Sequence, residues 1–435
     1  MQRASCLFLF FVLFAQAAWG FQLAPLHVAA DPSQRVEGEY LVLLREGLSR
    51  PLWLHRSVET QVASLRAALY AAADGSELKH VFAIGPDFRA LHLKLSPRLL
   101  DMVRRHPDVA LVEENQVVRT SETCRQQKDV PWNLGRIDTH ELARVDDDYS
   151  YGFTGRGVDV FIIDTGILTS HVEFGGRAEW GANFGDQSDF DCNGHGTHVA
   201  GIVAGHRYGV AKNATVIAVK VLGCAGAGSW DAVISGVQWT AEQAKKRGRP
   251  AVANMSLSGG KSPTANAAVA AAVALGVTIS VAAGNEFSDA CTRSPAMVPT
   301  VLTVAATYVA DENETATATT VRRDRRADFS NYGTCVNIAA PGKDIRSAWI
   351  NDGGGKPDAT YYTLSGTSMA SPHVAGVAAL VLSRFPEEQL TPREVGAYLR
   401  KHATNGVIDL ACEEAAPDDE PACRATPNKL LFTNC

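Results

Sequence analysis

From residue 131 onward, short apolar runs rich in β-branched residues alternate with longer segments that have helical spacing. The runs lie at 158–163, 216–222, 251–256, 277–282 and 301–305, and helices are predicted at 230–247 and 265–275. Runs that are apolar on both faces are typical of strands in parallel sheets. The alternation therefore predicts an α/β fold with a doubly wound, mostly parallel sheet. In such sheets, functional residues gather at the carboxyl ends of the strands.

Residues 21–120 have the pattern of a small α+β domain. Strands are predicted at 39–44, 90–95 and 109–112, and helices at 58–73 and 96–105. Residues 121–129 are polar and typical of a linker. We therefore predict a signal peptide at 1–20, a small domain at 21–125, the α/β domain at 126–410 and an irregular, disulfide-stapled tail at 411–435. A capping-box pattern that begins at Thr391 predicts a late helix.

The N-terminus has the composition of a secretory signal, with Arg3, an apolar core at 6–15 and small residues up to Gly20. The apolar core is too short to span a membrane. We therefore expect a secreted protein, with the lumen of a vacuole or lysosome as the alternative. Eight cysteines remain once Cys6 is removed with the signal, and an even number favours disulfides over a metal site.

The net charge of −6 gives no indication of a nucleic-acid partner. The short basic run at 322–326 is interrupted by Asp324 and is interpreted as a solvated loop that a protease could nick. Asn213 and Asn313 fit the glycosylation pattern. Asn254 fits it too, but Asn254 lies in an apolar strand run and is expected to be unmodified.

Three short segments carry the residue types that hydrolysis by a serine nucleophile requires. Asp164 follows the first strand run, His195 lies in a glycine-rich turn, and Ser368 precedes a helix of small residues. Such chemistry needs a base close to the serine and a carboxylate that orients the base. The amino end of the helix would also place N–H groups near a developing oxyanion.

Each segment alone has a simpler interpretation. An aspartate after a strand is usually a turn or cap residue, and a glycine–serine turn is usually only a turn. His195 and His198 have the spacing of a metal-binding pair, but no glutamate lies between them. All three segments together, in the order Asp, His, Ser, favour a serine hydrolase.

The segments at 164–166, 193–201, 282–285 and 366–376 resemble those of the subtilisin-like serine proteases, and finer marks at 131–137, 208–212, 294–296 and 329–333 are similar to the proteinase K branch. The resemblance extends from about residue 131 to residue 382. Residues 36–118 resemble, more loosely, the inhibitory propeptide of the family.

The resemblance implies a role for each matching residue. Ser368 would be the nucleophile, His195 the general base, Asp164 the carboxylate that orients it, and Asn285 the side-chain donor of the oxyanion hole. His198 would be structural, and two residues after the nucleophile, Ser371 and His373, would serve helix packing.

The resemblance also implies protein or peptide substrates that bind as extended strands. The implied substrate-binding residues are Gly226, Trp230, Ser256, Leu257, Ser258, Ala282, Ala283 and Gly284. The last three are small and uncharged and would line the pocket for the residue before the cut, which indicates an apolar or aromatic preference. Trp230 would lie near the pocket three residues further upstream, or would be a partly exposed packing residue.

Three features depart from the family pattern. Ser258 stands where the family usually has glycine, so the pocket rim would be narrower or more polar. Asn337 stands where the proteinase K pattern has a calcium-binding aspartate, and losing a carboxylate weakens such a site. Calcium is therefore not expected at Asn337 and stays open elsewhere, and the chemistry implies no cofactor. The segment 311–326 is a longer loop than the pattern requires.

Two disulfides follow from the resemblance to aqualysin-like members of the branch: Cys192–Cys224 and Cys291–Cys335. The first would link the loop of His195 to the substrate-binding segment around Gly226. The pairing of Cys124, Cys412, Cys423 and Cys435 stays open, and Cys412–Cys423 with Cys124–Cys435 is one arrangement.

We therefore expect a monomeric secreted serine endopeptidase, made as a zymogen that removes its own propeptide between Arg119 and Lys128. The propeptide would assist the slow folding of a parallel sheet and then occupy the cleft and inhibit the enzyme. One alternative is a protein that cuts only itself, keeps its propeptide and acts by binding. The segments at 289–291 and 331–335 resemble that group, whereas Asn285 argues against it. A hydrolase of non-peptide esters is a third interpretation.

Overall fold

The computed structural model describes residues 23–29, 35–45, 67, 74–84, 88–117, 124–142, 147–313, 320–350, 358–415 and 417–435. The chain forms two compact units, Met1–Ser121 and Glu122–Cys435. In the described part of the chain, no helix has the length and apolar character needed to cross a membrane.

The first unit is a five-stranded sheet in the order β1-β5-β2-β4-β3. Its strands are β1 (Leu26–His27), β2 (Arg35–Leu44), β3 (Glu77–Ile84), β4 (Phe88–Lys94) and β5 (Val109–Gln116), and its helix α2 spans Pro97–Arg104. Leu99 and Val103 of α2 pack on Val42, Leu91 and Val112 of the sheet. The three strands and the second helix predicted here are confirmed, whereas the helix predicted at 58–73 lies outside the described residues, apart from Ala67.

The second unit is built on an eleven-stranded sheet whose main path is β18-β20-β15-β13-β12-β11-β8-β10-β9. These strands are β8 (Asp159–Asp164), β9 (Ala178–Asn183), β10 (Thr215–Lys220), β11 (Ala251–Met255), β12 (Thr278–Ala282), β13 (Leu302–Asn313), β15 (Ile338–Pro341), β18 (Thr404–Asn405) and β20 (Lys429–Leu430). Every pair along this path from β9 to β20 is parallel. The predicted mostly parallel α/β sheet is thus confirmed.

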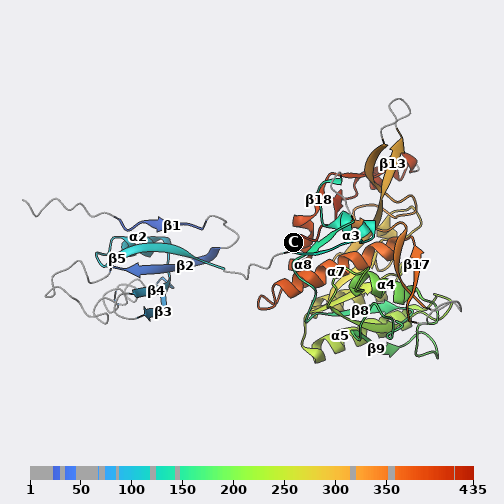
Figure 1. The fold of residues 1–435 in the computed structure, drawn as a ribbon, viewed down its shortest axis with the longest axis horizontal. Helices are drawn as coiled ribbons and strands as arrows, with labels where there is room; N and C mark the ends of the chain where they lie inside the picture. The colour runs from blue at the N-terminus through green and yellow to red at the C-terminus, as the bar shows by residue number, and fades with distance from the viewer. Residues whose placement is uncertain are drawn as a thin grey trace, which may run out of the picture. The chain divides into compact units, whose positions relative to one another are not determined.

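Helices cover both faces of this sheet (Figure 1). One face packs against α3 (Trp132–Ile137), α4 (His195–Ala204), α7 (Thr367–Arg384) and α8 (Pro392–His402), and the other against α5 (Trp230–Arg247) and α6 (Pro263–Ala274). Strand β8 shows why its run is apolar throughout, because Val160 and Ile162 join the first core while Phe161 and Ile163 join the second.

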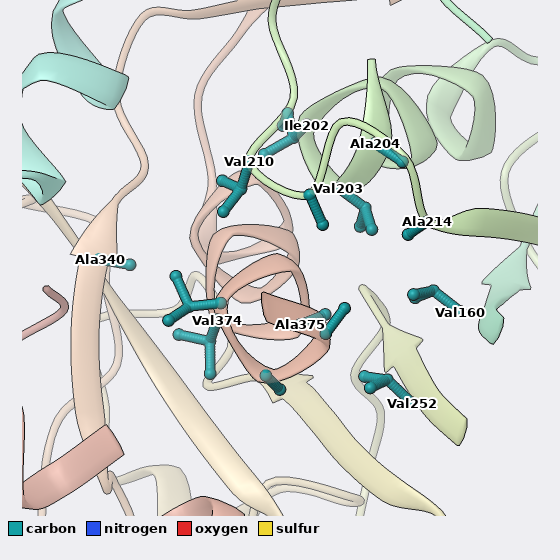
Figure 2. Packing of buried hydrophobic residues seen from close by; sticks show 14 of the residues in the cluster. Val160, Ile202, Val203, Ala204, Val210, Ala214, Val252, Ala340, Val374 and Ala375 are labelled. Carbon is teal, nitrogen blue, oxygen red and sulfur yellow. The ribbon is translucent and has the colours of Figure 1, made fainter. Parts of the chain in front are cut away.

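Helix α7 runs through the middle of the first core. Figure 2 shows its residue Ala375 on the side of Val203 of α4 and the strand residues Val160 and Val252, and Val374 on the side toward Ala340. Small residues let α7 lie close to the neighbouring segment that carries Val210, because a β-carbon on Gly376 would lie only 2.7 Å from the β-carbon of Val210. This packing fixes the amino end of α7 against the carboxyl ends of the strands.

Two sequence-based interpretations need correction. The segment 311–326 was expected to be a loop, but its described residues belong to a β-hairpin, since β13 continues to Asn313 and pairs antiparallel with β14 (Thr320–Arg326). The basic run is not solvated throughout, because Asp324 is buried and accepts two hydrogen bonds from the buried Arg136, at 2.7 and 2.8 Å. The run of charged residues hid a strand whose inward Asp324 forms an ion pair with Arg136 of α3.

The tail is also less irregular than expected. It contains a short helix, α9 (Glu420–Arg424), and β20, which pairs with β15 through Leu430 and Ala339. Four disulfides are present: Cys124–Cys435, Cys192–Cys224, Cys291–Cys335 and Cys412–Cys423. Among the glycosylation patterns, Asn213 is exposed and Asn254 is fully buried.

Candidate active site

Asp164 ends β8 at the carboxyl edge of the sheet, where it is fully buried. Its Oδ1 atom accepts a hydrogen bond from the Thr165 N–H at 2.7 Å and lies 2.7 Å from Nδ1 of His195. Because a carboxylate only accepts hydrogen bonds, Nδ1 carries the proton. The opposite ring nitrogen, Nε2, is therefore left as the acceptor, as a general base requires.

His195 is the first residue of α4, and the turn before it is held by Asp191. The two carboxylate oxygens of Asp191 accept hydrogen bonds from the N–H groups of Asn193, Gly194 and Thr197. The imidazole of His195 is about one quarter exposed, at 25%. Burial disfavours its charged form, but the Asp164 carboxylate outweighs this effect, so the pKa of His195 is raised above its ordinary 6.5.

Two further histidines near the site are neutral for a physical reason. Burial lowers the pKa of His198 to about 3, and that of His373 to about 4. Nε2 of His198 lies 3.1 Å from the carbonyl oxygens of both Ile345 and Tyr362, and Nδ1 of His373 lies 2.8 Å from the Met369 carbonyl. The His198 ring therefore joins two backbone segments to α4, whereas the His373 ring bonds to a carbonyl of its own helix.

Ser368 is the second residue of α7 and makes two contacts with Ser256. Its hydroxyl donates to the Ser256 carbonyl at 3.3 Å, and the Ser256 hydroxyl donates to the Ser368 carbonyl at 2.7 Å. The first bond is long, which leaves the Ser368 hydroxyl free to turn to another acceptor.

The amide of Asn285 is held by Thr367, the residue before Ser368. Its Oδ1 atom accepts hydrogen bonds from the backbone N–H of Thr367 at 2.8 Å and from its hydroxyl at 2.9 Å. The amide nitrogen is thereby directed away from Thr367. A β-carbon on Gly366 would lie 3.6 Å from both the Asn285 Nδ2 and the Ser368 nitrogen, so two donors border the space that Gly366 leaves open.

A cleft of about 690 Å³ joins these groups. It is lined by His195, Ser368 and Asn285 together with Thr165, Asn193, Leu222, Gly226, Ala227, Gly228, Ser229, Trp230, Val233, Ser256, Leu257, Ser258, Gly259, Ala282, Gly284 and Thr367. Asp164 lies behind His195. Ala283 is the exception among the expected binding residues: its side chain is fully buried and packs with Ala290 and Ala305, because it points to the opposite side of the chain from Ala282.

The walls of the cleft need close approaches that only glycine allows. A β-carbon on Gly259 would lie 2.7 Å from the indole ring of Trp230, and Gly284 has φ +104° with Asn331 Nδ2 2.4 Å from its β-carbon position. Trp230 therefore lies in the cleft wall. The sequence reasoning missed Thr367, Leu222 and Val233, although Thr367 lies within the motif that identified Ser368.

The Cys192–Cys224 disulfide joins the His195 turn to the Gly226 segment. The Asn193 side chain donates to the Cys224 carbonyl at 3.0 Å across the same junction. Beneath it, the fully buried Lys220 donates to the carbonyls of Thr165 and Leu222 and lies 3.5 Å from an oxygen of Asp186. The His195 turn and the Gly226 segment are thus one connected structure.

Two places among the described residues are candidate metal sites, and neither offers a free set of ligands. Oδ1 of Asn337 accepts the Thr303 N–H at 2.7 Å, so a backbone donor engages this oxygen. The Asp186, Cys192 and Cys224 side chains converge, but both sulfur atoms belong to a disulfide and are not free to ligate.

Comparisons with known proteins identify the family of the chain. Residues 155–419 match the model of the subtilase family, and residues 39–121 match the peptidase inhibitor I9 model. The chain is 41% identical to a subtilisin-like protease of Coccidioides posadasii, over 82% of this chain and 84% of the relative. It is 38% identical to an extracellular serine proteinase of a Thermus species, over 95% and 93%.

Two more relatives extend the comparison. An alkaline serine exoprotease A of Vibrio alginolyticus is 44% identical over 78% of this chain, which covers 57% of that relative. The crystal structure of a cold-adapted subtilisin-like serine proteinase superposes with a TM-score of 0.59 at 42% identity, and covers 71% of this chain and all of that one. The chain therefore belongs to the subtilase family of serine proteases and carries an I9 inhibitor propeptide.

Proposed function

We propose that this protein is a secreted endopeptidase made as a self-processing zymogen, in which Ser368 attacks the peptide carbonyl. One observation carries the proposal: His195, 2.7 Å from the buried Asp164, lines the same cleft as Ser368 and Asn285. These are the base, orienting carboxylate, nucleophile and oxyanion donor that acyl transfer needs.

In the proposed reaction the Ser368 hydroxyl leaves the Ser256 carbonyl and donates to Nε2 of His195. His195 takes the proton as the Ser368 oxygen bonds to the substrate carbon, and then gives it to the leaving amine. Asp164 stabilises the imidazolium that forms between these steps. The Asn285 amide and the Ser368 N–H, at the amino end of α7, donate to the oxyanion. Water then hydrolyses the acyl-enzyme by the same steps, without a cofactor.

The proposed substrate is an extended, largely apolar peptide segment between the Gly226 and Ser256–Ser258 segments. None of the described residues that line the cleft is Asp, Glu, Lys or Arg. A charged substrate side chain would lose its hydration there without gaining a partner, which costs more than burying an apolar one gains. Ala282 and Gly284 leave room for a large apolar residue before the cut. The exposed Ser258 adds a hydroxyl at the rim.

Structure at the start of the second unit restricts the range of residues in which the propeptide can be cut. Residues Arg125–Gln127 form β6, which pairs with β7 (Tyr149–Tyr151), and Cys124 is bonded to Cys435. A cut after Cys124 would leave the propeptide covalently attached to the enzyme. We therefore place the cut between residues 119 and 124, and expect the released enzyme to be a secreted monomer, with a vacuolar or lysosomal lumen as the alternative compartment.

The proposal is tested by expressing the full chain and its Ser368→Ala variant and incubating each with denatured casein and a fluorophosphonate probe. Wild type should lose about 100 residues, digest casein and be labelled, and the variant should stay full length and unlabelled. A wild type that cuts itself once, keeps its propeptide and digests nothing would instead support the binding-protein alternative. Processing of the Ser368→Ala variant, expressed without another protease, would overturn self-processing.

A further inference from the structure

We propose that Asn254 is a positioning residue for the nucleophile, acting through Ser256 on one side and Ser371 on the other. The inference rests on the proposed role of Ser368. Asn254 lies in β11, is fully buried and does not itself line the cleft. Its role follows from a defect that the sequence builds into α7.

The defect is Pro372, which lies inside α7. In a regular helix the N–H of residue 372 would donate to the carbonyl of residue 368, but proline has no N–H. The carbonyl of the proposed nucleophile therefore loses its helical partner. The Ser256 hydroxyl takes that place, donating to the Ser368 carbonyl at 2.7 Å. A side chain of the substrate-binding segment thus replaces a helix hydrogen bond.

Asn254 fixes this hydroxyl and also the next turn of α7. Its Nδ2 donates to the Ser256 hydroxyl at 2.9 Å, and its Oδ1 accepts from the Ser371 hydroxyl at 2.8 Å. The Ser280 hydroxyl oxygen of β12 lies 2.9 Å from the Ser371 hydroxyl oxygen and 3.0 Å from the Ser371 carbonyl oxygen. Because the Ser280 hydroxyl has one proton, it donates to one of these two oxygens. All these side chains are buried.

The direction of each hydrogen bond is determined by the one at the nucleophile. Because the Ser256 proton goes to the Ser368 carbonyl, the Ser256 oxygen can only accept from Asn254. An acceptor oxygen of Asn254 in that place would face lone pairs, so Nδ2 must point to Ser256 and Oδ1 to Ser371. The three hydrogen bonds therefore all point the same way: Ser371 donates to Asn254, Asn254 donates to Ser256, and Ser256 donates to the Ser368 carbonyl. In such an arrangement each bond polarises the next.

This chain joins the end of β11, where substrate is expected to bind, to the first two turns of α7. It sets the rotation of the turn that carries the Ser368 hydroxyl and N–H. An error of about 1 Å in such a group can cost about 10²-fold in rate. Asn254 should therefore affect kcat and leave KM largely unchanged, because the cleft wall itself is intact.

The sharpest variant is Asn254→Asp, which has the same shape but lacks the donor. Its carboxylate would draw the Ser256 proton away from the Ser368 carbonyl, and kcat should fall about tenfold or more, which is about 1.4 kcal/mol or more. A buried carboxyl has a raised pKa, and once protonated it can donate to Ser256 as the amide does. The ratio of variant kcat to wild-type kcat should therefore rise as the pH is lowered.

This pH signature separates positioning from a loss of stability. The titratable groups on the packed elements, Asp164 of β8, His195 of α4 and His373 of α7, are present in both proteins. A carboxylate at position 254 that raised the pKa of a histidine would lower the ratio as the pH falls, which is opposite to the rise expected here. Ser371→Ala provides a milder second variant, with a fall in kcat of about threefold to tenfold. Asn254→Asp/Ser371→Ala should be no slower than Asn254→Asp alone, because both act through one chain.

The experiment uses the self-processed full chain, a peptide anilide substrate and fluorophosphonate titration to count active sites. Ser383→Ala is the matched control. The Ser383 hydroxyl lies at the far end of the same helix, where it accepts from the Gly155 N–H and donates to the Leu380 carbonyl, so this variant should leave kcat unchanged. If wild type itself is not labelled, the proposed function fails. If wild type is labelled but both Asn254→Asp and Ser371→Ala keep wild-type kcat, or the ratio does not change with pH, the inference about Asn254 is overturned.

Discussion

Gly194 lies directly against the indole ring of Trp349: a β-carbon on Gly194 would come within 2.7 Å of two ring atoms. Gly194 also has φ +102°, in the left-handed region that L-residues rarely adopt. It precedes His195, so the proposed base is positioned by a residue that tolerates no side chain. The ring of Trp349 in turn packs edge-on against His198, which belongs to the same helix.

Gly194→Ala should therefore lower kcat/KM by about 10²-fold, because the turn must move away from Trp349 and carry His195 with it. The measurement is hydrolysis of a peptide anilide per titrated active site. Gly248→Ala is the matched control, since Gly248 also has a positive φ, 63°, but has no atom within 4 Å of its β-carbon position. An equal loss in both variants would show that backbone strain alone, and not the contact with Trp349, causes the effect.

Asp164→Asn should lower kcat by about 10⁴-fold, as for orienting carboxylates in other serine proteases. It should also shift the pH profile. The Asp164 carboxylate raises the pKa of His195 above 6.5, so wild-type activity should be lost as the pH falls below that raised pKa and His195 becomes charged. Without the carboxylate the pKa falls, and the acid limb of kcat/KM against pH should move to lower pH. A limb that stays in place would assign it to another group.

Replacing both Cys192 and Cys224 by serine should lower the free energy of unfolding by about 3–4 kcal/mol, the chain-entropy value for a loop of this size. KM should rise as well, because the bridge connects the His195 turn to the Gly226 segment. Urea unfolding and initial rates measure the two effects. The same change at Cys412 and Cys423 removes a bridge of much shorter span, 11 residues, and should leave KM unchanged.

Arg136→Ala should be strongly destabilising, by about 3–5 kcal/mol, because it leaves the buried Asp324 carboxylate without its partner. Only 1% of the Arg136 side chain and 3% of that of Asp324 are exposed. The double variant Arg136→Ala/Asp324→Ala should lose less than Arg136→Ala alone. Arg424→Ala, which breaks an exposed pair with Glu420, should cost under about 1 kcal/mol and serves as the control.

The parallel sheet was predictable because its strands are buried on both faces, so that each strand is an unbroken run of apolar residues in the sequence. The helix predicted at 230–247 begins and ends at the residues found, since Gly248 ends it with a positive φ. The hairpin of β13 and β14 was not predictable in the same way. Its second strand is mostly charged, and one of its inward residues, Asp324, is polar because it pairs with an arginine 188 residues away.

The residues of the candidate site show the same contrast between local patterns and contacts made only by tertiary packing. Asp164, His195, Ser368 and Asn285 lie in compact local motifs, so a single sequence was enough to propose them. Asn254 lies in no such motif and was recognised only as a glycosylation pattern in a strand, whereas Ser371 lies in the motif of Ser368 but was expected only to serve helix packing. Their connection exists only after β11 and α7 pack together, because hydrogen bonds between residues 117 apart leave no local pattern.

The bridge from Cys124 to Cys435 spans 311 residues, and the other three disulfides nest inside it without crossing. The whole catalytic unit therefore lies within one covalent ring. A single nick at any peptide bond inside the ring opens it without releasing a fragment. Copies of this enzyme that attack one another would consequently accumulate hidden breaks, which gel electrophoresis would reveal only after a reducing agent is added.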